Sequence, residues 1–303
     1  MSNDWIESYI RAGKAVIAAK KVAVKLIKPG VPFLEIANKC EEEILNHGCK
    51  LSFPINMSLD EIAAHYSPSI DDSTIVPNKG LLKIDIGSHH DGYIADSAIT
   101  INLNNDETLQ NVIDAAQEAL EAAIEIFKPG TKLYELGDVI AKKIKKRGLE
   151  PIYNLGGHEL KQYNLHAGPF IPNYKAISHN QILKPGDAYA CEPFATSGEG
   201  IVENGTKSYI YRFKKAKKGL PFIEKNYMDQ INKLTKKLPF SPRLLEKHNV
   251  IPKNKIQRTI DIFIRKKILD HYPLLIEKTK KPVAQQEHTI VIDLEGIPII
   301  TTK

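Results

Sequence analysis

Two carboxylates stand among apolar, core-building residues in the stretch Ile84-Asp85-Ile86-Gly87-Ser88-His89-His90-Asp91-Gly92-Tyr93-Ile94-Ala95-Asp96-Ser97. The Asp-Gly pair in its middle is strongly turn-prone, so the stretch predicts a β-hairpin. If residues 89–92 form the loop, Ser88 pairs with Tyr93. Asp85 then lies directly opposite Asp96, and His89 and His90 are expected to be solvated in the loop.

The expected position of the two aspartates has an electrostatic consequence. Facing residues of an antiparallel pair have Cβ atoms about 4.5–5.5 Å apart, and like charges at that distance repel. Two buried carboxylates so close together need a proton or a cation between them. A hard metal ion is the simplest solution, and the alternative is an exposed hairpin with two solvated aspartates.

The composition describes an ordinary globular chain. With 303 residues, 42% of them hydrophobic and 26% charged, the sequence can bury a large core as one domain or two. The N-terminus is polar and acidic and no run approaches 18 apolar residues, so we expect no export signal, no membrane span and a cytoplasmic location. Cys40, Cys49 and Cys191 lack C-x-x-C spacing and are expected to be buried, reduced thiols.

An internal repeat divides the chain. Apolar periodicity predicts helices over 4–27 and 34–45 with Lys-Pro-Gly between them, and again over 109–127 and 133–147 with Lys-Pro-Gly between them. Nine positions are identical at an offset of 100 residues: Ala15/Ala115, Ala19/Ala119, Ala23/Ala123, Lys28/Lys128, Pro29/Pro129, Gly30/Gly130, Glu35/Glu135, Ile44/Ile144 and Gly48/Gly148. This register favours two halves of one fold.

The repeat continues into polar residues. After its helix pair, the first half presents His65 and the second presents His166. Each half then has a turn and a predicted strand that contains an acid, Asp85 in strand 82–85 and Glu192 in strand 188–192. The two acids should therefore meet at the seam between the halves, where a ligand site is expected.

A basic segment follows. From Arg212 to Lys267 there are seventeen Lys and Arg against four acids, a net charge of +13 in a chain whose total is +6. Helical patterns at 225–238, 241–249 and 255–269 predict a small helical insert. Its charge admits two interpretations, a solvated lysine-rich face or a docking surface for ribosomal RNA.

The last part of the chain supplies one more acid. Strands are predicted over 283–293 and 297–302, and the first of them carries Gln285, Glu287 and Thr289 on one face. His288 points to the opposite face and is expected to pack in the core.

Five residues are candidate metal ligands: Asp85, Asp96, His158, Glu192 and Glu287. Four carboxylates and one imidazole are unlike a structural zinc site, which is rich in Cys and His. The set suits Mn, Fe or Co, and four carboxylates can neutralise two divalent ions. Two such ions about 3.5–4 Å apart would generate a bridging hydroxide at neutral pH and polarise a carbonyl group, which is hydrolytic chemistry.

These motifs resemble those of the methionine aminopeptidases over essentially the whole chain. The segments that carry the resemblance are Phe53-Pro54, Ala63-Ala64-His65-Tyr66-Ser67-Pro68, Asp85-Ile86-Gly87, Asp91-Gly92-Tyr93-Ile94-Ala95-Asp96, Gly157-His158, Leu165-His166-Ala167-Gly168, Cys191-Glu192-Pro193-Phe194 and Gln286-Glu287-His288-Thr289. The long interval between Glu192 and Glu287, with Leu238-Pro239-Phe240 inside it, resembles the type 2 enzymes in their short archaeal form.

The resemblance implies an α+β pita-bread fold. In that fold a pseudo-twofold repeat of helix pairs surrounds a curved antiparallel sheet. Residues 1–303 would form a single catalytic domain, and residues 212–275 would be the helical insert within it.

The resemblance also implies a role for each candidate ligand. Asp85 would bind one metal ion, Asp96 and Glu287 would bridge two, and His158 would bind the second. Glu192 would bind the second ion and carry a proton between the attacking water and the leaving amine.

Four further residues would contact the substrate. His166 would contact the scissile carbonyl oxygen and stabilise the oxyanion, and His65 would lie near the scissile amide nitrogen. Phe53 and Leu165 would line the methionine pocket.

The implied function is removal of the initiator methionine from nascent polypeptides whose second residue is small. The cofactors would be two divalent ions, Co, Mn, Fe or Zn, and the protein would act as a monomer without a membrane partner. The alternative is a catalytically silent protein that binds RNA or ribosomes on the same scaffold. Such relatives have lost ligands, whereas all five are present here.

Overall fold

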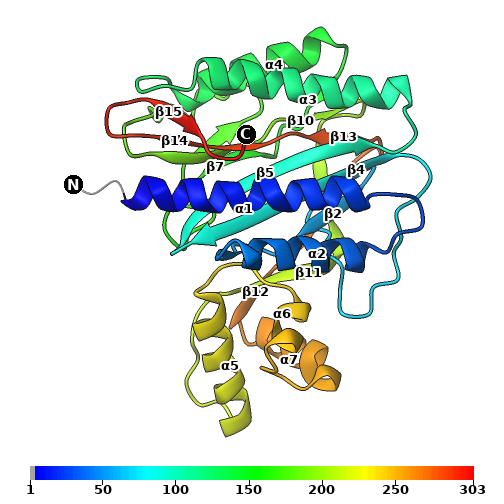
Figure 1. Ribbon diagram of the computed structural model, residues 1–303, viewed down its shortest axis with the longest axis vertical. Helices are drawn as coiled ribbons and strands as arrows, with labels where there is room; N and C mark the ends of the chain where they lie inside the picture. Colours follow the sequence, from blue (N-terminus) through cyan, green and yellow to red (C-terminus); the bar gives the residue numbers. More distant parts are fainter. Residues whose placement is uncertain (1–3) are drawn as a thin grey trace.

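The computed structural model describes residues 4–303, and two helix pairs form one side of it (Figure 1). The first pair is α1 (Asp4–Leu26) and α2 (Phe33–Asn46), and the second is α3 (Glu107–Glu125) and α4 (Leu133–Lys146). Each predicted helix lies within two residues of an observed one at both ends. The predicted repeat of helix pairs is therefore confirmed.

Backbone conformation explains part of the repeated sequence. Gly30 and Gly130, which follow the first helix of each pair, have φ angles of 86° and 94°. Side chains other than glycine are disfavoured there. Each pair then buries its apolar face against the strands of its own half, so that Val16, Ile36 and Ile84 share one hydrophobic cluster. Leu120, Ile140 and Ile290 share another.

The strands form small antiparallel sheets behind the helices (Figure 1). In the first half, β4 (Leu81–His90) pairs with β1 (Lys50–Leu51), β2 (Asn56–Leu59) and β5 (Tyr93–Asn102). In the second half, the order is β15 (Pro298–Ile300), β14 (His288–Ile292), β9 (Ala188–Cys191), β7 (Gly156–Glu159) and β8 (Phe170–Pro172). There are two smaller sheets. One contains β13 (Val283–Gln285), β10 (Phe194–Thr196) and β6 (Glu150–Pro151), and the other contains β11 (Val202–Phe213), β12 (Leu269–Glu277) and β3 (Ile62–Ala64).

The predicted register of the hairpin is wrong. His90 pairs with Tyr93, so the loop contains only Asp91 and Gly92. Both loop residues have positive φ, 49° and 88°, as a two-residue type I′ turn requires. Asp85 therefore lies opposite Ala98, and Asp96 lies opposite Gly87. The two acids are diagonal neighbours on the same face of the hairpin rather than directly opposed.

The shorter loop also corrects the prediction for two histidines. His89 and His90 belong to β4 instead of the loop. His89 is buried, and His90 is partly buried with its Nδ1 3.1 Å from Ser8 Oγ. His288, expected in the core, is only partly buried, and its Nδ1 lies 3.0 Å from Thr302 Oγ1.

The predicted strand 283–293 is interrupted. It consists of β13, which pairs with β10, and β14, which pairs with β9. The chain changes sheets between them, at Gln286 and Glu287. Glu287 therefore lies at the junction of two sheets and not inside one strand, and Glu192 directly follows β9 instead of ending it.

Three short helices lie between β11 and β12 and project beyond the helix layer (Figure 1). They are α5 (Phe222–Thr235), α6 (Pro242–Lys247) and α7 (Ile256–Arg265), with a single 3₁₀ turn, η1 (Lys253–Lys255), before the last. Ile231, Leu245 and Phe263 belong to a hydrophobic cluster of their own. Within residues 4–303, no helix is both long and apolar enough to cross a membrane.

Candidate metal centre

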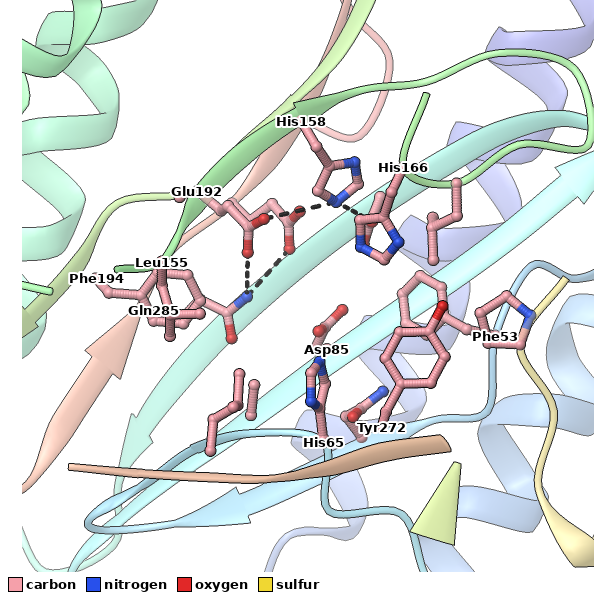
Figure 2. Close-up of a pocket in the computed structure, with 18 of the residues that line it drawn as sticks. Phe53, His65, Asp85, Leu155, His158, His166, Glu192, Phe194, Tyr272 and Gln285 are labelled. Atoms are coloured by element: carbon pink, nitrogen blue, oxygen red, sulfur yellow. Dashed lines mark hydrogen bonds and ion pairs between the residues drawn. The ribbon is translucent and has the colours of Figure 1, made fainter. Parts of the chain in front are cut away.

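One cavity of about 230 Å³ collects all the predicted site residues (Figure 2). The nine that line it are Phe53, His65, Asp85, Asp96, His158, Leu165, His166, Glu192 and Glu287. They come from both halves of the chain, because the cavity lies where the two halves meet. The three free cysteines are buried, as predicted.

The candidate ligands converge on the imidazole of His158. Its Nε2 lies 3.6 Å from Asp96 Oδ2 and 3.6 Å from Glu192 Oε1 (Figure 2). Asp96, His158 and Glu287 each offer one donor atom, and these atoms all lie within 4.8 Å of one another. Asp96, His158 and Glu287 are therefore close enough to hold a cation together, with Glu192 next to His158, and Asp85 lines the same cavity.

Side chains join the two halves at this point. Ser97 Oγ donates to the carbonyl oxygen of Glu287 at 2.5 Å, and Glu287 N donates to the carbonyl oxygen of Ala98 at 3.1 Å. Asp96 N donates to Thr289 Oγ1 at 2.7 Å, and that hydroxyl donates to the carbonyl oxygen of Asp96 at 2.8 Å. The backbones of Asp96 and Glu287 are thus fixed relative to each other.

Gln285 was missed as a site residue. Its Nε2 donates to Glu192 Oε2 at 3.1 Å and lies 3.4 Å from Glu287 Oε2 (Figure 2), so one amide orients two carboxylates. Thr100 holds it in place by donating to the carbonyl oxygen of Gln285 at 2.7 Å. The available signal was its position on the same face as Glu287, two residues earlier.

The three site histidines are neutral because they are buried. Burial lowers the pKa of His158 to about 4 and also lowers the pKa values of His65 and His166. His65 Nδ1 lies 2.9 Å from the carbonyl oxygen of Pro273, which fixes the proton on that nitrogen. Neutral His158 keeps a lone pair for a metal ion.

Tyr272, on β12, is a second residue that the sequence did not single out. Its ring centroid lies 5.3 Å from that of His65 and 6.2 Å from that of His166. The rings of His158 and His166 are 4.3 Å apart. No spacing pattern links Tyr272 to these histidines, because β12 follows the helical insert.

Four carboxylates share the cavity, and their pKa values show that each tends to hold a proton unless a cation takes its place. Burial raises the pKa of Asp85 to about 7. Burial, together with repulsion from neighbouring carboxylates, raises the pKa values of Asp96, Glu192 and Glu287 well above normal. Within residues 4–303, Asp85 Oδ1 and Asp96 Oδ1 are buried without a hydrogen-bond partner. These unpartnered oxygens and the neutral imidazole fit divalent cations.

Comparison with known proteins supports a metal-dependent hydrolase. The sequence profile of Metallopeptidase family M24 matches residues 7–228. A methionine aminopeptidase from Pyrococcus horikoshii is 39% identical over 296 residues, which cover 98% of this chain and 99% of that protein.

Two solved structures have the same fold. A thermophilic Arx1 matches with a TM-score of 0.86 at 16% identity and covers 99% of this chain and 91% of its own. Methionine aminopeptidase from Thermotoga maritima matches with a TM-score of 0.72 at 21% identity and covers 100% of this chain and 98% of its own. At these identities the likeness concerns the fold alone.

Proposed function

The chain belongs to metallopeptidase family M24, and from this premise we propose how its buried carboxylate cluster acts. The protein is a metalloaminopeptidase with the pita-bread fold, and it removes initiator methionine from protein N-termini. The convergence of four carboxylates, two buried and two partly buried, on a neutral histidine at the seam between the halves carries the proposal.

Five side chains would hold two divalent ions: Asp85, Asp96, His158, Glu192 and Glu287. Asp85 would contribute to one ion and His158 and Glu192 to the other, and Asp96 and Glu287 would contribute to both. When bound, the ions supply the Lewis acidity that lowers the pKa of water and polarises a carbonyl group. The four carboxylates would balance the charge of two dications. Which of Co, Mn, Fe and Zn binds would depend on the availability of each metal in the cell.

The protein's own side chains transfer the proton, stabilise the oxyanion and contact the scissile amide. Glu192, held by Gln285, accepts the proton of the attacking water and delivers it to the leaving amine. Neutral His166 donates to the oxygen of the scissile carbonyl and stabilises its developing negative charge. His65 contacts the amide nitrogen through Nε2, because its Nδ1 is engaged with Pro273.

The methionine side chain would occupy the apolar part of the cavity. Phe53 and Leu165 are only 5% and 8% exposed and line it. Ile210 and Pro239 also line it, so four apolar residues enclose an unbranched side chain. Tyr272 also lines the cavity, with its ring centroid 5.3 Å from that of His65.

We expect a preference for small second residues. Chelator-stripped protein supplied with Mn, Co or Fe should release methionine from Met-Ala-x peptides. Met-Leu-x should be cut at least about 100-fold less efficiently, because a cavity of about 230 Å³ that must also hold the methionine leaves little room for a larger second side chain. Chromatography of free methionine measures both rates. Failure to cut either peptide, with no metal bound, would defeat the proposal.

The silent RNA-binding alternative is not favoured, since all five ligands are present and full-length relatives are methionine aminopeptidases. We propose that the enzyme acts on nascent chains as a cytoplasmic monomer. Residues 1–303 would be one catalytic domain with residues 212–275 as its insert. Size-exclusion chromatography with light scattering tests the monomer.

The basic insert is our proposed contact with ribosomal RNA. Its lysines between Lys214 and Lys218 are exposed, and they adjoin Phe222, which is 85% exposed. Such a contact depends on released counterions. Co-sedimentation with ribosomes should therefore decrease steeply between about 50 and 200 mM salt, and an unchanged amount of bound protein would exclude the contact.

A further inference from the structure

A second cavity lies between α2 and the helical insert, outside the metal centre. Its volume is about 590 Å³, larger than that of the catalytic cavity and within the range of small-molecule sites. Apolar side chains from both walls form its floor: Leu45, Leu51, Phe53, Leu234, Leu238, Leu244 and Val250. Figure 1 shows α2 beside the insert.

The two walls of this groove are firmly joined. Arg243, at the start of α6, is 7% exposed and donates to Glu41 Oε1 of α2 at 2.6 Å. The same guanidinium donates to Asn38 Oδ1 at 2.7 Å and to the carbonyl oxygen of Pro68 at 2.9 Å. The groove is therefore preformed, and binding in it need not order its walls.

The polar rim of the groove is cationic. Lys50, Lys233, Lys236 and Lys247 all line it, and within residues 4–303 none of them lies in an ion pair. The only acid among the lining residues is Glu41, whose charge Arg243 already neutralises at 2.6 Å. Lys236 Nζ already donates to the Tyr163 hydroxyl at 2.8 Å. An anion would thus meet the ammonium groups of Lys50, Lys233 and Lys247 and no free carboxylate.

Two polar side chains of the groove, His89 and Thr235, have hydrogen-bonding capacity to spare. His89 is 7% exposed, and its Nδ1 accepts a hydrogen bond from Gly92 N at 3.0 Å, so Nε2 carries the proton. Within residues 4–303, the hydrogen bond at Nδ1 is the one that the His89 side chain makes. The hydroxyl of Thr235, a residue 5% exposed, is buried without a partner among these residues. Both groups can serve an incoming acceptor.

We propose that this groove binds a small organic anion with an apolar body, such as a medium-chain carboxylate. The floor takes the hydrocarbon, and the lysines with His89 take the carboxylate. A polar neutral molecule would leave the apolar side chains of the floor in contact with water. A cation would be repelled by the lysines of the rim.

The groove has a consequence for the catalytic cavity, which rests on the proposed function. Phe53 and Pro239 line both cavities, so they form a shared wall. A ligand on the outer side restrains the Phe53 ring in the position that lines the methionine pocket. Occupation should therefore lower the KM for methionyl peptides and leave kcat unchanged.

The binding test uses a fluorescent anion, 8-anilinonaphthalene-1-sulfonate, with the folded full chain. We expect one saturable site, displacement by decanoate and no displacement by decylamine, which has the same chain length and the opposite charge. Reversing Lys50 and Lys247 together to glutamate should weaken binding of both anions about tenfold. Lys21→Glu with Lys25→Glu is the matched control, because both lysines are exposed on α1 away from the groove.

The kinetic test adds decanoate to the metal-loaded enzyme. KM for a Met-Ala-x peptide should fall about threefold, because bound decanoate would already have ordered the Phe53 side chain before the peptide binds. The proposed site would be overturned if the fluorescence did not saturate, or if the Lys50/Lys247 variant bound with the same affinity. Its link to the methionine pocket would be overturned if decanoate bound and the KM did not change. Because fluorescence needs no catalysis, an inactive enzyme would refute the proposed function and still leave the groove testable.

Discussion

Replacing Asp96 by asparagine is expected to leave the protein folded but without metal and without activity. Asp96 is 3% exposed, and its carboxylate adjoins His158 at 3.6 Å and a donor atom of Glu287 within 4.8 Å. An amide has nearly the same shape but no charge to share between two dications. We expect the metal content to fall to background and methionine release to fall about a thousandfold or more, equivalent to several kcal/mol of lost transition-state stabilisation.

The matched control is His166→Ala. His166 lies beside His158, with ring centroids 4.3 Å apart, but it is not among the proposed ligands. This variant should retain both ions and lose turnover. Elemental analysis after gel filtration separates the two cases. An Asp96→Asn protein that still holds two ions per chain would refute the bridging role of Asp96.

The broad architecture could be predicted because local signals repeat. The two Lys-Pro-Gly helix stops recur at Lys28 and Lys128, and in each the glycine has a positive φ that other residues avoid. The residue pattern indicated the five candidate ligands and the two histidines of the repeat. The resemblance added Phe53 and Leu165 and a role for each, and all nine residues line one cavity. Polar residues in apolar surroundings were the informative positions, since a core tolerates them only for a reason.

Register and tertiary partners could not be predicted from the same signals. A loop of two or four residues around Asp91-Gly92 satisfies the sequence equally well, and the choice decides which residue faces Asp85. The twist of the strands favours the type I′ turn of two residues. Tyr272 escaped notice because His65 is brought to it only by the folding of distant segments. For Gln285 the shared face with Glu287 was a signal, but its hydrogen bond to Glu192, 93 residues away, was not visible in the sequence.

The groove beside α2 was also invisible in the sequence. Lys50, Lys233 and Lys247 come from segments nearly 200 residues apart, and each alone is an ordinary exposed lysine. Contacts between the insert and the body, among them Arg243 to Glu41 and Lys253 to Asp71, bring them to one rim. A charge count described the insert as basic but could not identify which lysines would face an apolar floor.

The stabilisation that metal gives should increase with pH. A carboxyl whose pKa is raised in the folded protein binds a proton that the unfolded chain has released. Its contribution to stability is complete below the unfolded value of 3.8 and is lost as the pH rises through the folded value, about 7 for Asp85. In chelator-stripped protein each such carboxyl therefore lowers stability by up to about 1.4 kcal/mol per pH unit in this window.

Bound divalent ions reverse this dependence, because they stabilise the carboxylates as anions and metal binding releases their protons. The difference in melting temperature between metal-loaded and stripped protein should thus be several degrees larger at pH 7.5 than at pH 5.5. Taking the difference removes groups that titrate in both forms, such as Lys83, whose burial lowers its pKa to about 7. Asp96→Asn should lose most of the pH dependence. If this difference in melting temperature were equal at the two pH values, or larger at pH 5.5, the carboxyls would not hold protons in the stripped protein. Something other than the metal would then relieve the repulsion among them.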